Sequence, residues 1–145
     1  MDSQDAEFLD LRFRFHMDGF SSSLGLHLIA DFFDASALYD PSPAEETLRR
    51  AAIAANAQVL GINMRDFGQR AGFTGMALLA ESHISVHTWP EHGYAAIDIF
   101  MCGDAVPQRS LEVLKSYFRP QRVDVQSIKR GLIGQSRHRL AAAGC

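Results

Sequence analysis

Cysteine, lysine and long apolar runs are all scarce in this sequence. The two cysteines, Cys102 and Cys145, cannot build a disulfide framework, so a reducing cytoplasm is the expected location. The longest apolar stretches, such as residues 76–80, fall far short of the roughly 20 residues that a membrane span requires. The acidic N-terminus lacks the positive flank and apolar block of a signal peptide. A membrane is therefore not an expected partner.

Basic charge is also limited. Lys and Arg together number 14 against 17 Asp and Glu, which gives a formal net charge of −3. A protein that binds nucleic-acid phosphates needs a clustered basic surface, so nucleic acid is not an expected partner either. Lys115 and Lys129 are the only lysines. An enzyme that uses pyridoxal phosphate needs a Schiff-base lysine and usually a much larger fold, so the composition counts against that cofactor.

What the sequence does have is the composition of one globular domain, with 145 residues of which 47% are hydrophobic and 21% charged. One helix is expected to begin at Ser42, which would cap it, with Pro43 in the first helical position and Glu45 completing a capping box. A second helix should open at Pro107 and end before Pro120. Apolar, strand-type patterns occupy residues 24–33, 58–67, 73–80, 84–89, 94–102 and 122–128.

This order of elements predicts an α+β two-layer sandwich. Two similar halves each offer strands and one helix, so a mostly antiparallel sheet should carry both helices on one face. The single domain is expected to span residues 24–131. Residues 1–23 would form an N-terminal arm, in which Phe13 and Phe15 allow a short edge strand, and residues 132–145 a C-terminal tail.

Residues 81–89 carry the polar side chains most suggestive of chemistry. On a strand, His83, Ser85, His87 and Trp89 share one face, while Ile84 and Val86 share the other. A polar face turned to water is the simplest explanation of that pattern. His83 and His87 would lie about 13 Å apart on a strand, too far to share one tetrahedral metal ion.

Cys102 allows two interpretations from its position alone. No Ser of the sequence sits in a G-x-S-x-G elbow, which counts against a serine hydrolase. A cysteine at the end of an apolar strand is most often a small core residue, and a Cys–His hydrolase is the alternative.

The stretch AESHISVHTWPE at residues 80–91 resembles the processing segment of the S-adenosylmethionine decarboxylase family, in its small prokaryotic type. Residues 93–100 and 102–104 continue the pattern, and the similarity covers residues 24–131. Members of this family are proenzymes. The resemblance implies that Ser82 attacks the Glu81 carbonyl, that His87 then removes the Cα proton of residue 82, and that the chain breaks between residues 81 and 82.

The resemblance also implies the cofactor and its use. Residue 82 would become a pyruvoyl group, with neither pyridoxal phosphate nor a metal, and its carbonyl would condense with the substrate's amino group as a Schiff base. Cys102 matches the family's proton donor, and a free thiol holds its proton at neutral pH. The product of S-adenosylmethionine decarboxylation is the aminopropyl donor for spermidine synthesis. Family members of this size resemble half of a longer, duplicated enzyme, so a homodimer of cleaved chains is expected.

The substrate itself is open at this stage. Trp89 and Phe67 suit the stacking of adenine and a sulfonium, and Glu91 completes the expected substrate-binding set. The loop at residues 67–74 and the segment 34–39 both depart from the family pattern. Related pyruvoyl enzymes that act on arginine or ornithine keep the same cleavage segment and would need a carboxylate counter-charge. The carboxylates available for that role are Asp31, Asp34 and Asp66. A third alternative is an uncleaved homologue without catalytic activity.

Overall fold

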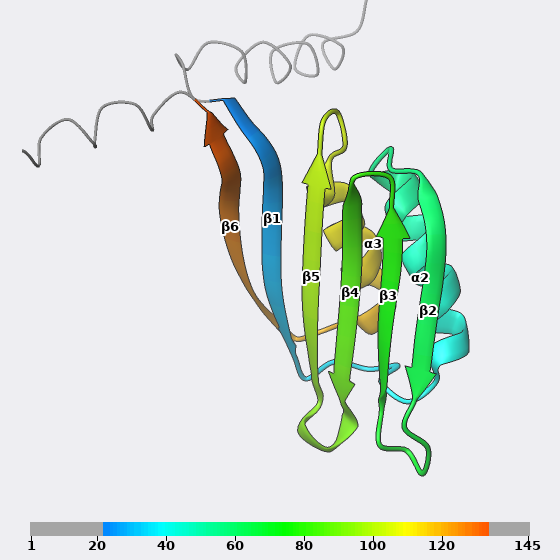
Figure 1. Ribbon diagram of the computed structural model, residues 1–145. Helices are drawn as coiled ribbons and strands as arrows, with labels where there is room; N and C mark the ends of the chain where they lie inside the picture. The colour runs from blue at the N-terminus through cyan, green and yellow to red at the C-terminus, as the bar shows by residue number, and fades with distance from the viewer. Residues whose placement is uncertain (1–21, 134–145) are drawn as a thin grey trace, which may run out of the picture. The chain divides into compact units, whose positions relative to one another are not determined.

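The computed structural model describes residues 22–133, and the expectations for residues 1–21 and 134–145 lie outside the described residues. Residues Leu24–Arg130 form one compact unit. Its strands belong to a six-stranded sheet in the order β2-β3-β4-β5-β1-β6, with both helices behind the sheet in the view of Figure 1. Neighbouring strands from β2 across to β1 all pair antiparallel. The predicted α+β sandwich is therefore confirmed.

Each predicted element is present, with small changes at its ends. The strand predicted to start at residue 84 starts at Ser82, and the strand predicted to end at residue 128 continues to Ile133. The strands are β1 (Ser22–Phe33), β2 (Val59–Asp66), β3 (Phe73–Leu79), β4 (Ser82–Trp89), β5 (Tyr94–Cys102) and β6 (Arg122–Ile133). The helices are α2 (Pro41–Ala54), α3 (Pro107–Phe118) and the short 3-10 helix η1 (Pro90–His92).

The start of α2 corrects one prediction. Asp40 caps the helix rather than Ser42, because its side chain accepts a hydrogen bond of 3.0 Å from the Ser42 N–H. Pro41 opens the helix, where its fixed φ fits and its missing N–H is not needed. Ser42 consequently lies inside the first turn, and the capping box predicted for Ser42 and Glu45 is replaced by the Asp40 cap.

The core lies between the sheet and the two helices. Each helix contributes apolar side chains to it, with Leu48 and Ala51 on α2 and Leu114 on α3 each at 1% exposure or less. Ile84 and Val86 of β4 are fully buried in the same core. No helix within residues 22–133 is long and apolar enough to cross a membrane.

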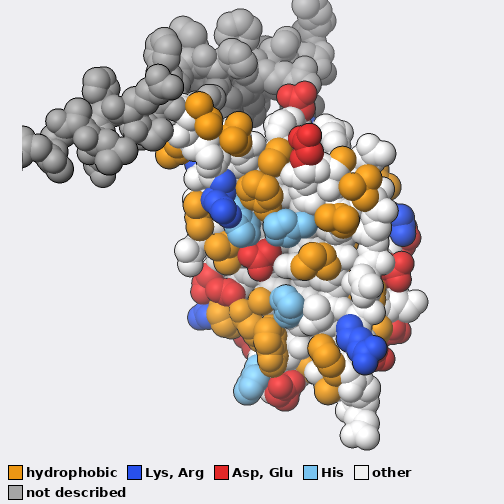
Figure 2. Space-filling model, viewed as in Figure 1, with side chains coloured by type: hydrophobic (Ala, Val, Ile, Leu, Met, Phe, Trp, Pro, Cys, Tyr) orange, Lys and Arg blue, Asp and Glu red, His pale blue; other side chains and the backbone are white. Residues whose placement is uncertain are grey.

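The other face of the sheet carries no helix in the described part of the chain. Figure 2 views this face and shows hydrophobic side chains spread across it, with histidines and acidic groups among them. Met76, Leu78 and Trp89 project from it and are between 40% and 57% exposed. Large apolar side chains at this level of exposure, several on one face, are typical of a surface that meets a partner.

Candidate active site

Ser82 is the first residue of β4 and follows a tight turn. Leu79 of β3 pairs with Ser82, so Ala80 and Glu81 alone make the connection between the two strands. Glu81 is exposed and adopts a left-handed backbone with φ of 61°. The Ser82 side chain is buried at 8% exposure, and its Oγ accepts a hydrogen bond of 3.2 Å from the backbone N–H of Cys102.

Cys102 reaches this position because β5 ends beside the start of β4. The register pairs His83 with Phe100, which brings the end of β5 level with the turn at residues 80 and 81. Cys102 is half-buried and is a free thiol. Since side chains alternate along a strand, Cys102 lies on the same face as Phe100, the face without helices. Ser82 and Cys102 thus lie next to each other at the same end of the neighbouring strands β4 and β5.

His87 is held on the helix-free face by β3. Its Nδ1 lies 2.9 Å from the hydroxyl of Thr74, its partner in the β3–β4 register. Nε2 is therefore the ring nitrogen directed away from Thr74. Five residues of strand separate Ser82 from His87, or about 17 Å, and the two side chains lie on opposite faces. One chain does not bring His87 to Ser82.

The expected substrate-binding residues gather at the other end of β4. Trp89 ends that strand, Glu91 is exposed in η1, and Phe67 is 59% exposed in the loop between β2 and β3. Both connections lie at the same end of the sheet in Figure 1. Seven residues separate Ser82 from Trp89, or about 23 Å along the strand. Ser82 and the aromatic residues of the same chain are therefore far apart.

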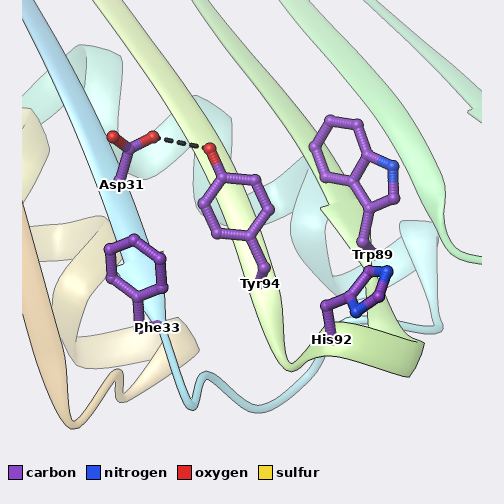
Figure 3. A pocket seen from close by; sticks show the side chains of 5 residues that line it. All are labelled: Asp31, Phe33, Trp89, His92 and Tyr94. Carbon is purple, nitrogen blue, oxygen red and sulfur yellow. Dashed lines mark hydrogen bonds between the residues drawn. The ribbon is translucent and has the colours of Figure 1, made fainter.

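Trp89 lines an open hollow on the helix-free face (Figure 3). Its volume is about 610 Å³, and its lining residues are Asp31, Phe33, Trp89, His92 and Tyr94. The Tyr94 ring is 5.3 Å from that of Trp89 and 5.4 Å from that of Phe33, between ring centroids. The Tyr94 hydroxyl donates a hydrogen bond of 2.5 Å to Asp31. The hollow thus combines the rings of Phe33, Trp89 and Tyr94 with the imidazole of His92 and one carboxylate.

Asp31 also changes the acidity of its neighbour. Burial, the hydrogen bond to Asp31 and the negative charge of Asp31 together raise the pKa of Tyr94 to about 12. Tyr94 consequently remains a neutral hydrogen-bond donor across the physiological range. A neutral phenol leaves the Asp31 carboxylate as the anionic group of the hollow, which suits a cationic ligand.

Sequence reasoning did not identify all of these residues. Besides Trp89, the sequence indicates only Asp31 among the lining residues, as a candidate counter-charge. It gives no signal for Phe33, Tyr94 and His92. A second polar cluster, near the Ser82 end of the same face, was also missed. In it, Nε2 of His27 lies 3.0 Å from a carboxylate oxygen of Asp98. These contacts depend on β1 pairing with β5, and a local sequence pattern carries no signal for that pairing.

No group of three or more potential metal-ligating side chains occurs among residues 22–133.

Comparison with known proteins relates these features to one family. A family model described as S-adenosylmethionine decarboxylase matches residues 26–131. An S-adenosylmethionine decarboxylase proenzyme of Thermomicrobium roseum is 40% identical over 112 residues, covering 77% of this chain and 97% of that protein. A proenzyme of the same name from Pyrobaculum aerophilum is 37% identical over 115 residues, covering 77% and 92% respectively.

A solved structure is similar as well. The crystal structure of the adenosylmethionine decarboxylase from Aquifex aeolicus VF5 matches with a TM-score of 0.71 and 34% sequence identity. The match covers 79% of this chain and 96% of that chain. The similarity therefore includes the sheet, both helices and the segment around Ser82.

Proposed function

Because this chain belongs to the S-adenosylmethionine decarboxylase family, we propose that it cleaves itself at Glu81-Ser82 and then decarboxylates S-adenosylmethionine. The product would be the aminopropyl donor for spermidine synthesis in the cytoplasm. The observation that carries this proposal is the placement of Ser82, which follows an exposed two-residue turn and whose Oγ is held by the Cys102 N–H.

Self-cleavage is a reaction of the chain's own atoms. Ser82 Oγ bonds to the Glu81 carbonyl carbon, the C–N bond breaks, and the hydroxyl proton passes to the freed nitrogen, leaving an ester and an amine. A base then takes the Cα proton of residue 82, the Cβ–O bond breaks, and Glu81 leaves as a carboxylate. Water replaces the nitrogen of the resulting dehydroalanine, releasing ammonia and leaving the pyruvoyl group.

The surroundings of Ser82 are compatible with a pyruvoyl group at residue 82. The break falls in an exposed turn, so the new ends can separate without disturbing the core beneath Ile84. The pyruvoyl carbonyl, once formed, supplies the electrophile that binds an amine and accepts electrons as carbon dioxide leaves. The thiol of Cys102, at the adjacent strand end, would return a proton to the substrate carbon.

We propose a homodimer as the active form, because each chain holds the required groups at opposite ends of β4. Two copies stacked in opposite directions through their helix-free faces would bring Cys102 and the cleavage turn of one chain near His87 and Trp89 of the other. The exposed Met76 and Leu78 on this face support such packing. His87 would then act as the base on the partner's residue 82.

S-adenosylmethionine is the substrate favoured by the family match. Trp89, Phe67 and Glu91 would bind the nucleoside and sulfonium. The alternative substrates, arginine and ornithine, are favoured by one observation, namely that Asp31 lies in the same hollow as Trp89. A guanidinium or ammonium group would find both a carboxylate and aromatic rings there.

Intact-mass spectrometry tests the cleavage directly. Wild-type protein should yield fragments 1–81 and 82–145, the latter blocked by pyruvoyl, while Ser82→Ala should remain one chain. A wild-type chain that stays whole would instead support the uncleaved, non-catalytic alternative. Carbon dioxide release from the three substrates at equal concentration then decides the substrate. Faster release from arginine or ornithine would overturn the assignment to S-adenosylmethionine.

A further inference from the structure

Glu81, the residue that donates the carbonyl of the scissile bond, has an unfavourable backbone. Its φ of 61° lies in the left-handed region, where the Cβ of an L-residue comes too close to the following carbonyl oxygen. Glycine avoids this contact, but the sequence places glutamate there. Such conformations persist only where the surrounding structure leaves the residue no alternative.

The neighbours of Glu81 are fixed on both sides. The Ala80 N–H donates a hydrogen bond of 2.9 Å to the carbonyl of Gln58, the residue before β2. Ser82 is paired with Leu79 in the β3–β4 ladder, and its Oγ accepts from the Cys102 N–H. Contacts with Gln58, β3 and the end of β5 therefore fix residues 80 and 82. The unfavourable backbone conformation of the turn falls on Glu81, between them.

We propose that the strained backbone of Glu81 accelerates self-cleavage, an inference that rests on the proposed function. Conversion of an amide into an ester is uphill, so strain present in the precursor and lost during the step lowers its net cost. When Ser82 Oγ bonds to the Glu81 carbon, the C–N bond breaks and the proton moves to nitrogen. Glu81 then leaves the backbone of the turn and can return to negative φ.

The test compares Glu81→Ala with Glu81→Gly. Both variants lack the carboxylate, and they differ only in the Cβ that makes left-handed backbone unfavourable. Each precursor is made by cell-free synthesis, and its cleavage is followed by denaturing electrophoresis. We expect Glu81→Gly to cleave about five-fold more slowly than Glu81→Ala, equivalent to about 1 kcal/mol in the barrier. Equal rates would overturn the proposal.

Measuring thermal stability distinguishes the relief of backbone strain from disruption of the turn by the substitution. In the uncleavable Ser82→Ala background, Glu81→Gly should melt about 4 °C above Glu81→Ala, because the strain is removed from the folded state. A disrupted turn would lower both the cleavage rate and the melting temperature. A melting temperature that does not rise would therefore also overturn the proposal.

Arg119 provides the matched control. It ends α3 in left-handed backbone with φ of 46°, and its exposed loop is not part of the cleavage turn. Arg119→Gly should melt above Arg119→Ala, with both cleaving at the same rate. A parallel change in cleavage would show that stability alone sets the rate, and the proposal would fall. A wild-type chain that does not cleave would overturn the proposed function itself, whereas the melting comparison would still measure the strain.

Discussion

Thr74 and His87 face each other across the β3–β4 ladder, with the threonine hydroxyl 2.9 Å from Nδ1 of the imidazole. In the proposed dimer, His87 takes a proton from residue 82 of the partner chain, and this role would require a fixed orientation of its ring. Thr74→Val keeps the shape of the side chain but removes this contact, so cleavage should slow about five- to ten-fold. Thr74→Ser retains the hydroxyl and should cleave near the wild-type rate. The rates can be compared by densitometry of precursor and products.

If His87 acts on the partner chain, two inactive variants should complement each other when they are co-expressed. Ser82→Ala and His87→Ala should each fail to cleave when expressed alone. When the two chains are co-expressed, the mixed dimer pairs the intact Ser82 of one with the intact His87 of the other, so the His87→Ala chain should be cleaved. Different affinity tags allow each chain to be identified by mass spectrometry. Cleavage of His87→Ala by itself would contradict this arrangement, as would a monomer in light scattering.

The backbone N–H and the thiol of Cys102 have different proposed roles, which a substitution can test separately. Cys102→Ser keeps the N–H that holds Ser82 Oγ, so the chain should still be cleaved. Loss of the thiol should lower the decarboxylation rate at least about 100-fold, the usual scale for a proton donor. The assay is carbon dioxide release per pyruvoyl-bearing chain. Wild-type turnover by fully cleaved Cys102→Ser would remove the thiol from the reaction.

The raised pKa of Tyr94 predicts a loss of stability in strong alkali. The folded protein favours the protonated phenol, so this contribution is complete below the ordinary tyrosine pKa and disappears as the pH rises through the folded pKa of about 12. Wild type should therefore lose stability relative to Tyr94→Phe between pH 10 and pH 12, as measured by denaturant unfolding. Asp31→Asn removes the charge and should bring the spectroscopic titration of Tyr94 to lower pH. Identical pH profiles for wild type and Tyr94→Phe would contradict the assignment.

Local sequence patterns predicted the helices and strands, but they did not predict how the site is assembled. Apolar patterns located the strands, and capping and proline signals located both helices. The alternation at residues 83–89 placed His87 and Trp89 together on one face, which in the structure is the helix-free side. The α2 cap was misplaced by two residues because Asp40 and Ser42 are both good capping residues, and Pro41 decides between them.

The hollow could not be predicted because its parts are distant in the chain. Asp31 and Tyr94 are separated by 63 residues, and they meet only through the pairing of β1 with β5. The distance between Ser82 and His87, in contrast, follows from the strand prediction itself. The five-residue spacing that marks the family motif is also what keeps the two side chains of one chain apart.

The strand order determines how the two fragments of a cleaved chain would dissociate and refold. A break after Glu81 assigns β1, β2 and β3 to one polypeptide and β4, β5 and β6 to the other. In the sheet, β1 lies between β5 and β6, while β3 borders β4, so the fragments are interleaved rather than side by side. The fragments cannot dissociate without breaking the pairing of β3 with β4 and the pairings of β1 with β5 and β6. Once unfolded, however, the two pieces must find each other again, so a protein that first folded as one molecule would refold at a rate that depends on its concentration.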